Sequence, residues 1–150
     1  MKTEYIKSRC PADTEAAGAA LAKRLLDTDL PRYIALYGDL GAGKTAFARG
    51  VASVLCPNAA VRSPTFALVH EYRGAVPVFH FDMYRIESED DLYSIGYDDY
   101  LARDGVIIVE WSENIPYALP EQYVRVRIEK DDPENDDSRS IVIEEVNAPC

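Results

Sequence analysis

A glycine-rich stretch at residues 38–45 has the residue types and the spacing that hold a phosphate group. It reads Gly-Asp-Leu-Gly-Ala-Gly-Lys-Thr, which matches the pattern G-x-x-x-x-G-K-[ST] of a phosphate-binding loop. The glycines let consecutive backbone N–H groups point at an anion, Lys44 reaches the β- and γ-phosphates, and the Thr45 hydroxyl is placed to bind Mg²⁺. The pattern therefore predicts a nucleoside triphosphate as the ligand. The predicted contacts come from Asp39, Leu40, Gly41, Ala42, Gly43, Lys44 and Thr45.

Two apolar stretches end in an acidic residue that would complete a metal site. Val106–Val109 leads to Glu110, and Val78–Phe81 leads to Asp82. Mg²⁺ prefers oxygen ligands and keeps several waters, so one hydroxyl and one carboxylate suffice. The stretch before Glu110 is the more apolar, as a central strand should be, although glutamate stands where aspartate is usual. We therefore expect Thr45 and Glu110 to hold Mg²⁺, and Asp82 to orient the attacking water or a switch segment.

The Ser63-Pro64-Thr65-Phe66 segment follows the helix predicted after the phosphate loop, where a nucleotide-sensing switch would lie. Pro64 favours an extended backbone just before it, which would let the Thr65 hydroxyl sense the γ-phosphate or its metal. A plain turn before a strand is the alternative. His80 lies two residues before Asp82 and so faces the same side of a strand, where we expect a hydrogen-bonded core residue.

The elements that would position these residues alternate along the chain. Hydrophobic periodicity and turn residues predict strands at Glu4–Arg9, Tyr33–Tyr37 and Gly105–Glu110. They predict helices from Pro11 to before Pro31 and over Thr45–Ala52, and one or two short surface helices within Glu87–Tyr100. They also predict a hairpin of Phe66–Tyr72 and Val76–Asp82, and an exposed terminal hairpin of Tyr123–Glu129 and Ser140–Glu145 with a flexible tip. The predicted fold class is α/β. It is a three-layer fold like that of P-loop NTPases, with a mainly parallel sheet, antiparallel additions and a C-terminal β-hairpin. We expect residues 1–150 to form a single domain.

The composition limits the partners and the compartment. The chain has 150 residues and a net charge of −10, and its Lys and Arg residues are scattered, which argues against a protein that grips nucleic acid by itself. Cys10, Cys56 and Cys150 are odd in number and form no C-x-x-C pair, which suits a reducing compartment and neither a zinc site nor a disulfide framework. No apolar run approaches the length of a membrane span. We therefore expect a cytoplasmic protein without membrane contact.

Four motifs, in this order and at this spacing, resemble those of the bacterial TsaE (YjeE) family. They are Gly-Asp-Leu-Gly-Ala-Gly-Lys-Thr at 38–45, Ser-Pro-Thr-Phe at 63–66, His-Phe-Asp-Met-Tyr-Arg at 80–85 and Val-Glu-Trp-Ser at 109–112. The resemblance covers nearly the whole chain. It implies a weak, Mg²⁺-dependent ATPase of the tRNA threonylcarbamoyladenosine pathway that works with the TsaD and TsaB proteins. Those partners modify the adenosine next to the anticodon of tRNAs that read ANN codons, so tRNA would be met only indirectly.

The resemblance also implies roles for particular residues. It assigns Mg²⁺ to Thr45 and Glu110, a nucleotide-side carboxylate to Asp82, and a switch-like position to Thr65. With Lys44, the last two complete the predicted catalytic set. Two further nucleotide contacts are implied at the edge of the base pocket and in the terminal hairpin: Pro11 and Arg139.

Other classes of phosphate-loop protein fit the sequence less well. A small-molecule kinase needs a lid that brings arginine to the transferred phosphate, but the candidate lid, Glu87–Tyr100, contains no Lys or Arg. A regulatory GTPase needs an N-K-x-D motif and a D-x-x-G motif, and the sequence has neither. A nucleotide-sensing module without productive hydrolysis stays open as an alternative.

Overall fold

A strand, a glycine-rich turn and a helix form the middle of the fold, as predicted. In the computed structural model, which describes residues 3–64 and 67–147, β2 spans Tyr33–Tyr37 and α2 spans Lys44–Leu55. The turn between them requires glycine, because Gly41 and Gly43 have φ angles of 76° and 113° in the left-handed region. Thr65 and Phe66 of the predicted switch segment lie outside the described residues.

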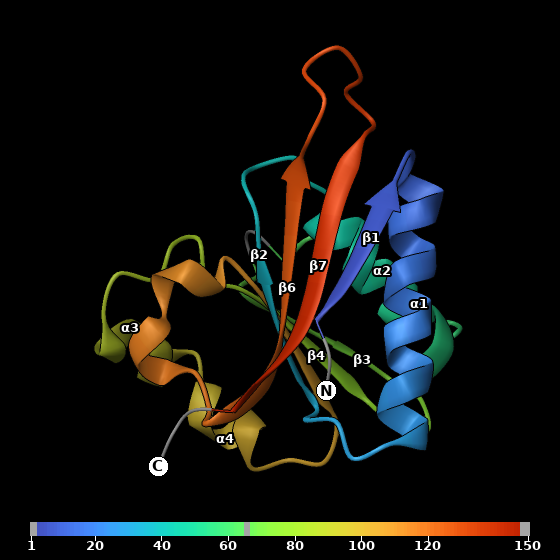
Figure 1. The fold of residues 1–150 in the computed structure, drawn as a ribbon. Coiled ribbons are helices and arrows are strands. Elements are labelled where there is room, and N and C mark those ends of the chain that lie inside the picture. Colours follow the sequence, from blue (N-terminus) through green and yellow to red (C-terminus); the bar gives the residue numbers. More distant parts are fainter. Residues whose placement is uncertain (1–2, 65–66, 148–150) are drawn as a thin grey trace.

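The described strands form one mixed sheet of seven, in the order β1-β7-β6-β2-β5-β4-β3 (Figure 1). Besides β2, they are β1 (Glu4–Ser8), β3 (Val69–Tyr72), β4 (Val78–Asp82), β5 (Val106–Glu110), β6 (Gln122–Lys130) and β7 (Arg139–Asn147). The central strands β6, β2, β5 and β4 run parallel. The remaining pairs are antiparallel: β7 with β6, β1 with β7, and β3 with β4. Every residue of β5 is buried between β2 and β4. The fold class and the central position of this strand are confirmed.

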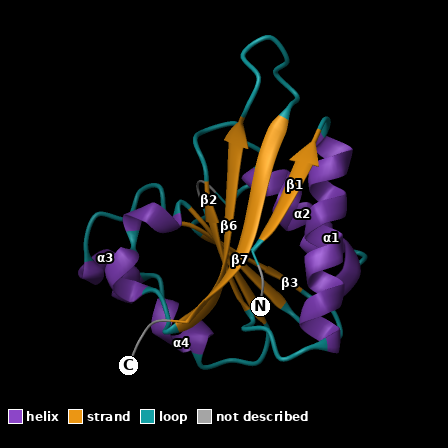
Figure 2. Cartoon of the chain, in the orientation of Figure 1, coloured by secondary structure: helices purple, strands orange, loops and turns teal. Residues whose placement is uncertain are grey.

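Helices cover both faces of the parallel part of the sheet (Figure 2). The long helices α1 (Pro11–Asp27) and α2 pack on one face, around a core that includes Leu21, Phe47 and Ile108. The short helices α3 (Glu89–Ser94) and α4 (Tyr97–Leu101), with the 3₁₀ turns η1 (Ser112–Asn114) and η2 (Pro116–Ala118), lie on the other face over a second core that includes Phe81. The helices of the described residues are all too short or too polar to cross a membrane.

Two glycines let α1 and α2 approach each other closely. A Cβ atom added at Gly50 would lie 1.9 Å from the Glu15 carbonyl oxygen, and one at Gly18 would lie 2.2 Å from the Phe47 carbonyl oxygen. Both distances are far below van der Waals contact, so only glycine fits at this crossing. The crossing brings the first turn of α1 to the phosphate loop, where Thr14 Cγ2 is 3.7 Å from the position of a Cβ on Gly43.

The terminal hairpin is confirmed, but the prediction that it is exposed is wrong. β6 lies inside the sheet between β7 and β2, and Val124, Val126 and Ile128 are fully buried. Alternating apolar and polar residues predict one covered face, but they do not say whether a strand pairs on one side or on both. Only the tip between β6 and β7, residues 131–138, projects beyond the sheet (Figure 1).

Candidate functional site

The phosphate loop and the ends of two parallel strands bring a hydroxyl and two carboxylates to one edge of the sheet. Thr45 Oγ1 lies 3.1 Å from Glu110 Oε2 and 3.3 Å from Oε1, within hydrogen-bond reach of both. Asp82 is the register partner of Glu110 across β4 and β5, so the two side chains leave the sheet on the same face. Both acids are buried, each with 4% of its surface exposed. The three predicted metal and nucleotide-side residues are therefore neighbours.

Asp82 also organises the backbone after β4. Its Oδ1 accepts a 2.9 Å hydrogen bond from the Tyr84 N–H, and its own N–H donates to the Leu68 carbonyl at 3.0 Å. The next N–H, that of Met83, donates to the Glu110 carbonyl at 3.0 Å. These bonds hold the Asp82 carboxylate at the sheet edge through the backbone on both sides of it.

Lys44 lies folded back over its own loop. Its Nζ donates a short hydrogen bond to the Gly38 carbonyl and lies 3.6 Å from the centroid of the Trp111 ring. Trp111 follows Glu110 in a left-handed backbone conformation, with φ of 60°, and its ring also contacts Tyr84. Burial lowers the pKa of Lys44, while the nearby carboxylates, Glu113 first among them, act in the opposite direction. The contact between the Trp111 ring and Lys44 is one that the sequence did not predict.

The two outlying residues implied by the resemblance have different surroundings. Arg139, the first residue of β7, donates from Nε to the Ala42 carbonyl at 2.7 Å and from Nη2 to the Gly41 carbonyl at 3.2 Å. It therefore ties the outward carbonyls of the phosphate loop to the terminal hairpin. Pro11 is exposed at the first position of α1. It lies one turn before Thr14, whose Cγ2 contacts the position of a Cβ on Gly43.

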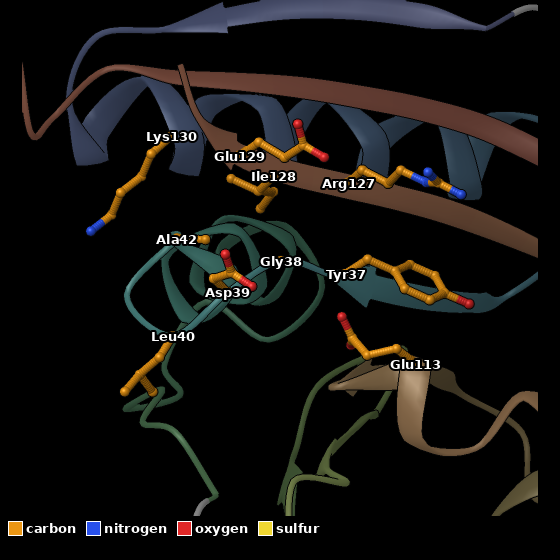
Figure 3. A pocket seen from close by; sticks show the side chains of 10 residues that line it. All are labelled: Tyr37, Gly38, Asp39, Leu40, Ala42, Glu113, Arg127, Ile128, Glu129 and Lys130. Carbon is orange, nitrogen blue, oxygen red and sulfur yellow. The ribbon is translucent and has the colours of Figure 1, made fainter. Parts of the chain in front are cut away.

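A pocket of about 690 Å³ opens beside the phosphate loop (Figure 3). The loop, β6 and η1 supply its walls. The lining residues are Tyr37, Gly38, Asp39, Leu40, Ala42, Glu113, Arg127, Ile128, Glu129 and Lys130. Pro11 and Arg139, the two outlying residues that the resemblance implies, are not among these lining residues.

One buried contact of the site joins two residues that the sequence did not pair. His80 Nε2 lies 2.5 Å from Glu110 Oε2, and His80 Nδ1 lies 2.9 Å from the Tyr72 hydroxyl. His80 has no exposed surface, which agrees with the expected hydrogen-bonded core residue. The two-residue spacing to Asp82 placed His80 on the correct face, but its partner is on the neighbouring strand.

The donor set suits a magnesium ion that is shared with a nucleotide. Thr45 and Glu110 offer hydroxyl and carboxylate oxygens, which are hard ligands. In the part of the chain that the structure describes, no three His, Cys, Asp or Glu side chains gather to hold a metal by themselves. Mg²⁺ usually keeps several waters and is bound through one or two protein oxygens plus substrate phosphates, which the Thr45–Glu110 pair would suit.

Comparisons with known proteins agree with this geometry. Residues 8–141 match the family model described as threonylcarbamoyl adenosine biosynthesis protein TsaE. The protein of that name from Bacillus subtilis (strain 168) is 37% identical over 132 residues, covering 87% of this chain and 78% of the relative, and the one from Treponema pallidum is 34% identical over 121 residues, covering 81% and 87%. The crystal structure of YdiB from Bacillus subtilis superposes with a TM-score of 0.73 at 29% identity, covering 95% of this chain and 84% of that one.

Proposed function

The chain belongs to the TsaE family, and from that premise we propose that it binds ATP with Mg²⁺ and hydrolyses it slowly in the threonylcarbamoyladenosine modification of tRNA. The partners proposed are the TsaD and TsaB proteins, and the compartment is the cytoplasm. The names of the relatives support the pathway. The chemistry of the chain's own residues supports the nucleotide.

The observation that carries the proposal is the contact between the Thr45 hydroxyl and the Glu110 carboxylate, at the point where the phosphate loop leads into α2. In a phosphate-loop protein these are the positions of the hydroxyl and the strand-end acid that hold Mg²⁺. The bound ion would neutralise charge on the β- and γ-phosphates. The loop N–H groups and the N-terminus of α2 attract the same anion.

Lys44 and Asp82 take the remaining roles. The Lys44 ammonium exchanges the Gly38 carbonyl and the Trp111 ring for phosphate oxygens when the nucleotide enters. The Asp82 carboxylate, held by the Tyr84 N–H, orients the attacking water and accepts its proton. Thr65 belongs to the Ser-Pro-Thr-Phe motif that resembles the family's, and on that basis its proposed role is to sense the γ-phosphate. These assignments give Lys44, Asp82 and Thr65 to catalysis and Thr45 and Glu110 to the metal.

The charge of the chain favours protein partners over direct tRNA contact. A domain with a net charge of −10 neutralises few phosphates, so counterion release contributes little to binding nucleic acid. Productive turnover should therefore depend on the TsaD and TsaB proteins, which bring the tRNA.

The test is phosphate release from ATP by the purified chain, alone and with purified TsaD and TsaB. It is followed by detection of threonylcarbamoyladenosine in tRNA that is supplied together with a preformed, activated threonylcarbamoyl donor. Slow release by the chain alone and tRNA modification that requires both the chain and ATP support the proposal. Modification that proceeds equally well with a non-hydrolysable analogue would identify a nucleotide-sensing module instead. No phosphate release under either condition, together with no ATP binding by the chain in calorimetry, would overturn the nucleotide assignment.

A further inference from the structure

A buried chain of hydrogen bonds leads away from the proposed metal ligand Glu110. His80 Nε2 contacts Glu110 Oε2 at 2.5 Å, His80 Nδ1 contacts the Tyr72 hydroxyl at 2.9 Å, and that hydroxyl donates to the Arg62 carbonyl at 3.2 Å. This series of hydrogen bonds crosses from β5 through β4 to β3 and ends at Arg62, one residue before Ser63. It therefore connects the metal end of the site to the segment that carries the family's Ser-Pro-Thr-Phe motif.

The geometry of His80 separates it from the reacting groups. Its side chain has no exposed surface, so neither the nucleotide nor bulk water reaches the ring. A carboxylate accepts hydrogen bonds and does not donate them, so Nε2 carries the hydrogen in the contact with Glu110. His80 therefore acts on the site only through the orientation of that carboxylate.

The Glu110 carboxylate is shared between two donors. Oε2 accepts from His80, and the Thr45 hydroxyl contacts both carboxylate oxygens. A buried carboxylate with two fixed donors has little rotational freedom, and partners that orient a metal ligand in this way commonly tune metal affinity. Without the His80 donor, one oxygen of a side chain that is 95% buried would lose its closest partner.

We infer that His80 is a positioning residue: with Tyr72 behind it, it holds the Glu110 carboxylate in the orientation that binds Mg²⁺ beside Thr45. The inference rests on the proposed function, because it assumes that Mg²⁺ binds together with a nucleotide. It adds a role to a residue that would otherwise be read as core packing. Tyr72 anchors the ring from its far side through the 2.9 Å contact with Nδ1.

The experiment compares four variants by their affinity for a non-hydrolysable ATP analogue, AMP-PNP, measured by calorimetry in excess Mg²⁺ and in excess EDTA. His80→Phe removes both ring nitrogens and keeps an aromatic core side chain, and His80→Gln keeps an N–H that can reach Glu110. Tyr72→Phe removes only the hydroxyl that contacts Nδ1. The matched control is Tyr97→Phe, which removes a buried hydroxyl, bonded to Tyr33 at 2.7 Å, on the other face of the sheet.

The ratio of the two dissociation constants measures how much Mg²⁺ improves nucleotide binding. For His80→Phe we expect this ratio to fall by about tenfold, the lower end of effects seen when the partner of a metal ligand is removed, with the EDTA value within about twofold of wild type. His80→Gln should recover most of the ratio, and Tyr72→Phe should lower it by about threefold. Tyr97→Phe should leave it unchanged. A general loss of packing would instead weaken both constants equally.

Three outcomes would overturn the inference. They are a wild-type ratio in His80→Phe, an equal loss in Mg²⁺ and EDTA, and a His80→Gln variant as defective as His80→Phe. If His80→Phe does not fold by circular dichroism, Tyr72→Phe decides, and an unchanged ratio there counts against the inference. A wild-type chain whose affinity for the analogue does not respond to Mg²⁺ would instead refute the proposed function.

Discussion

Replacing Lys44 by methionine removes the ammonium group from the phosphate loop and keeps most of the side-chain volume. Volume matters because Lys44 is only 5% exposed, so truncation to alanine would also open a cavity. The loop and the core below it should therefore keep their structure. The change isolates what the charge contributes to binding a triphosphate.

The magnitude follows from the contacts that Lys44 exchanges. A hydrogen bond between charged groups contributes up to about 3 kcal/mol, so contacts with two phosphate groups are worth about 6 kcal/mol. To make them, Lys44 gives up its bond to the Gly38 carbonyl, about 1.5 kcal/mol, and its contact with the Trp111 ring, about 1 kcal/mol. The net loss of binding free energy in the Lys44→Met variant is about 3.5 kcal/mol, which corresponds to a roughly 300-fold larger dissociation constant for ATP.

Calorimetric titration with ATP and Mg²⁺ measures this effect. The matched control is Lys23→Met on the exposed side of α1, which makes the same change in net charge away from the loop and should leave the affinity unchanged. Thermal unfolding without nucleotide checks that both variants are folded. A Lys44→Met variant that binds ATP within about fivefold of wild type would refute the assignment of Lys44 to the phosphates.

Further predictions concern the metal, the reaction, the fold and the tRNA. Thr45→Ala should reduce Mg²⁺-dependent ATP affinity by about tenfold and leave the affinity in EDTA unchanged, and equal losses under both conditions would contradict its role as a ligand. Asp82→Asn should bind ATP like wild type but lower steady-state phosphate release by about 100-fold or more, and an unchanged rate would remove it from catalysis. Gly50→Ala should destabilise the fold by about 1–3 kcal/mol or more in urea unfolding, because its Cβ would meet the Glu15 carbonyl oxygen, and wild-type stability would show that the helices can separate without cost. The isolated chain should not bind tRNA at micromolar concentration and physiological salt in a fluorescence titration, and salt-resistant binding would contradict the argument from its charge.

The sequence alone was enough to locate the glycine-rich turn and the strand-end acids that the structure brings together, because these signals are local. Gly41 and Gly43 adopt a left-handed backbone conformation that other residues rarely adopt. A glycine-rich segment between a strand and a helix therefore forms this turn whatever the rest of the fold. Glu110 and Asp82 each close an apolar stretch. Parallel strands end at the same edge of a sheet. Once both strands are part of the sheet that contains β2, these two acids must therefore lie near the phosphate loop.

Only the tertiary structure decided how the sheet is ordered and how the site is supported. The alternation in the terminal hairpin fits an exposed pair as well as a strand beside β2, and the choice depends on which apolar faces remain to be covered. The contacts of His80 with Glu110 and of Lys44 with the Trp111 ring join side chains that lie far apart in the sequence. Periodicity fixes the face of a strand on which a side chain lies, but its partner there depends on strand order and register. Strand order and register depend on how the whole chain packs, so they cannot be predicted from any single segment.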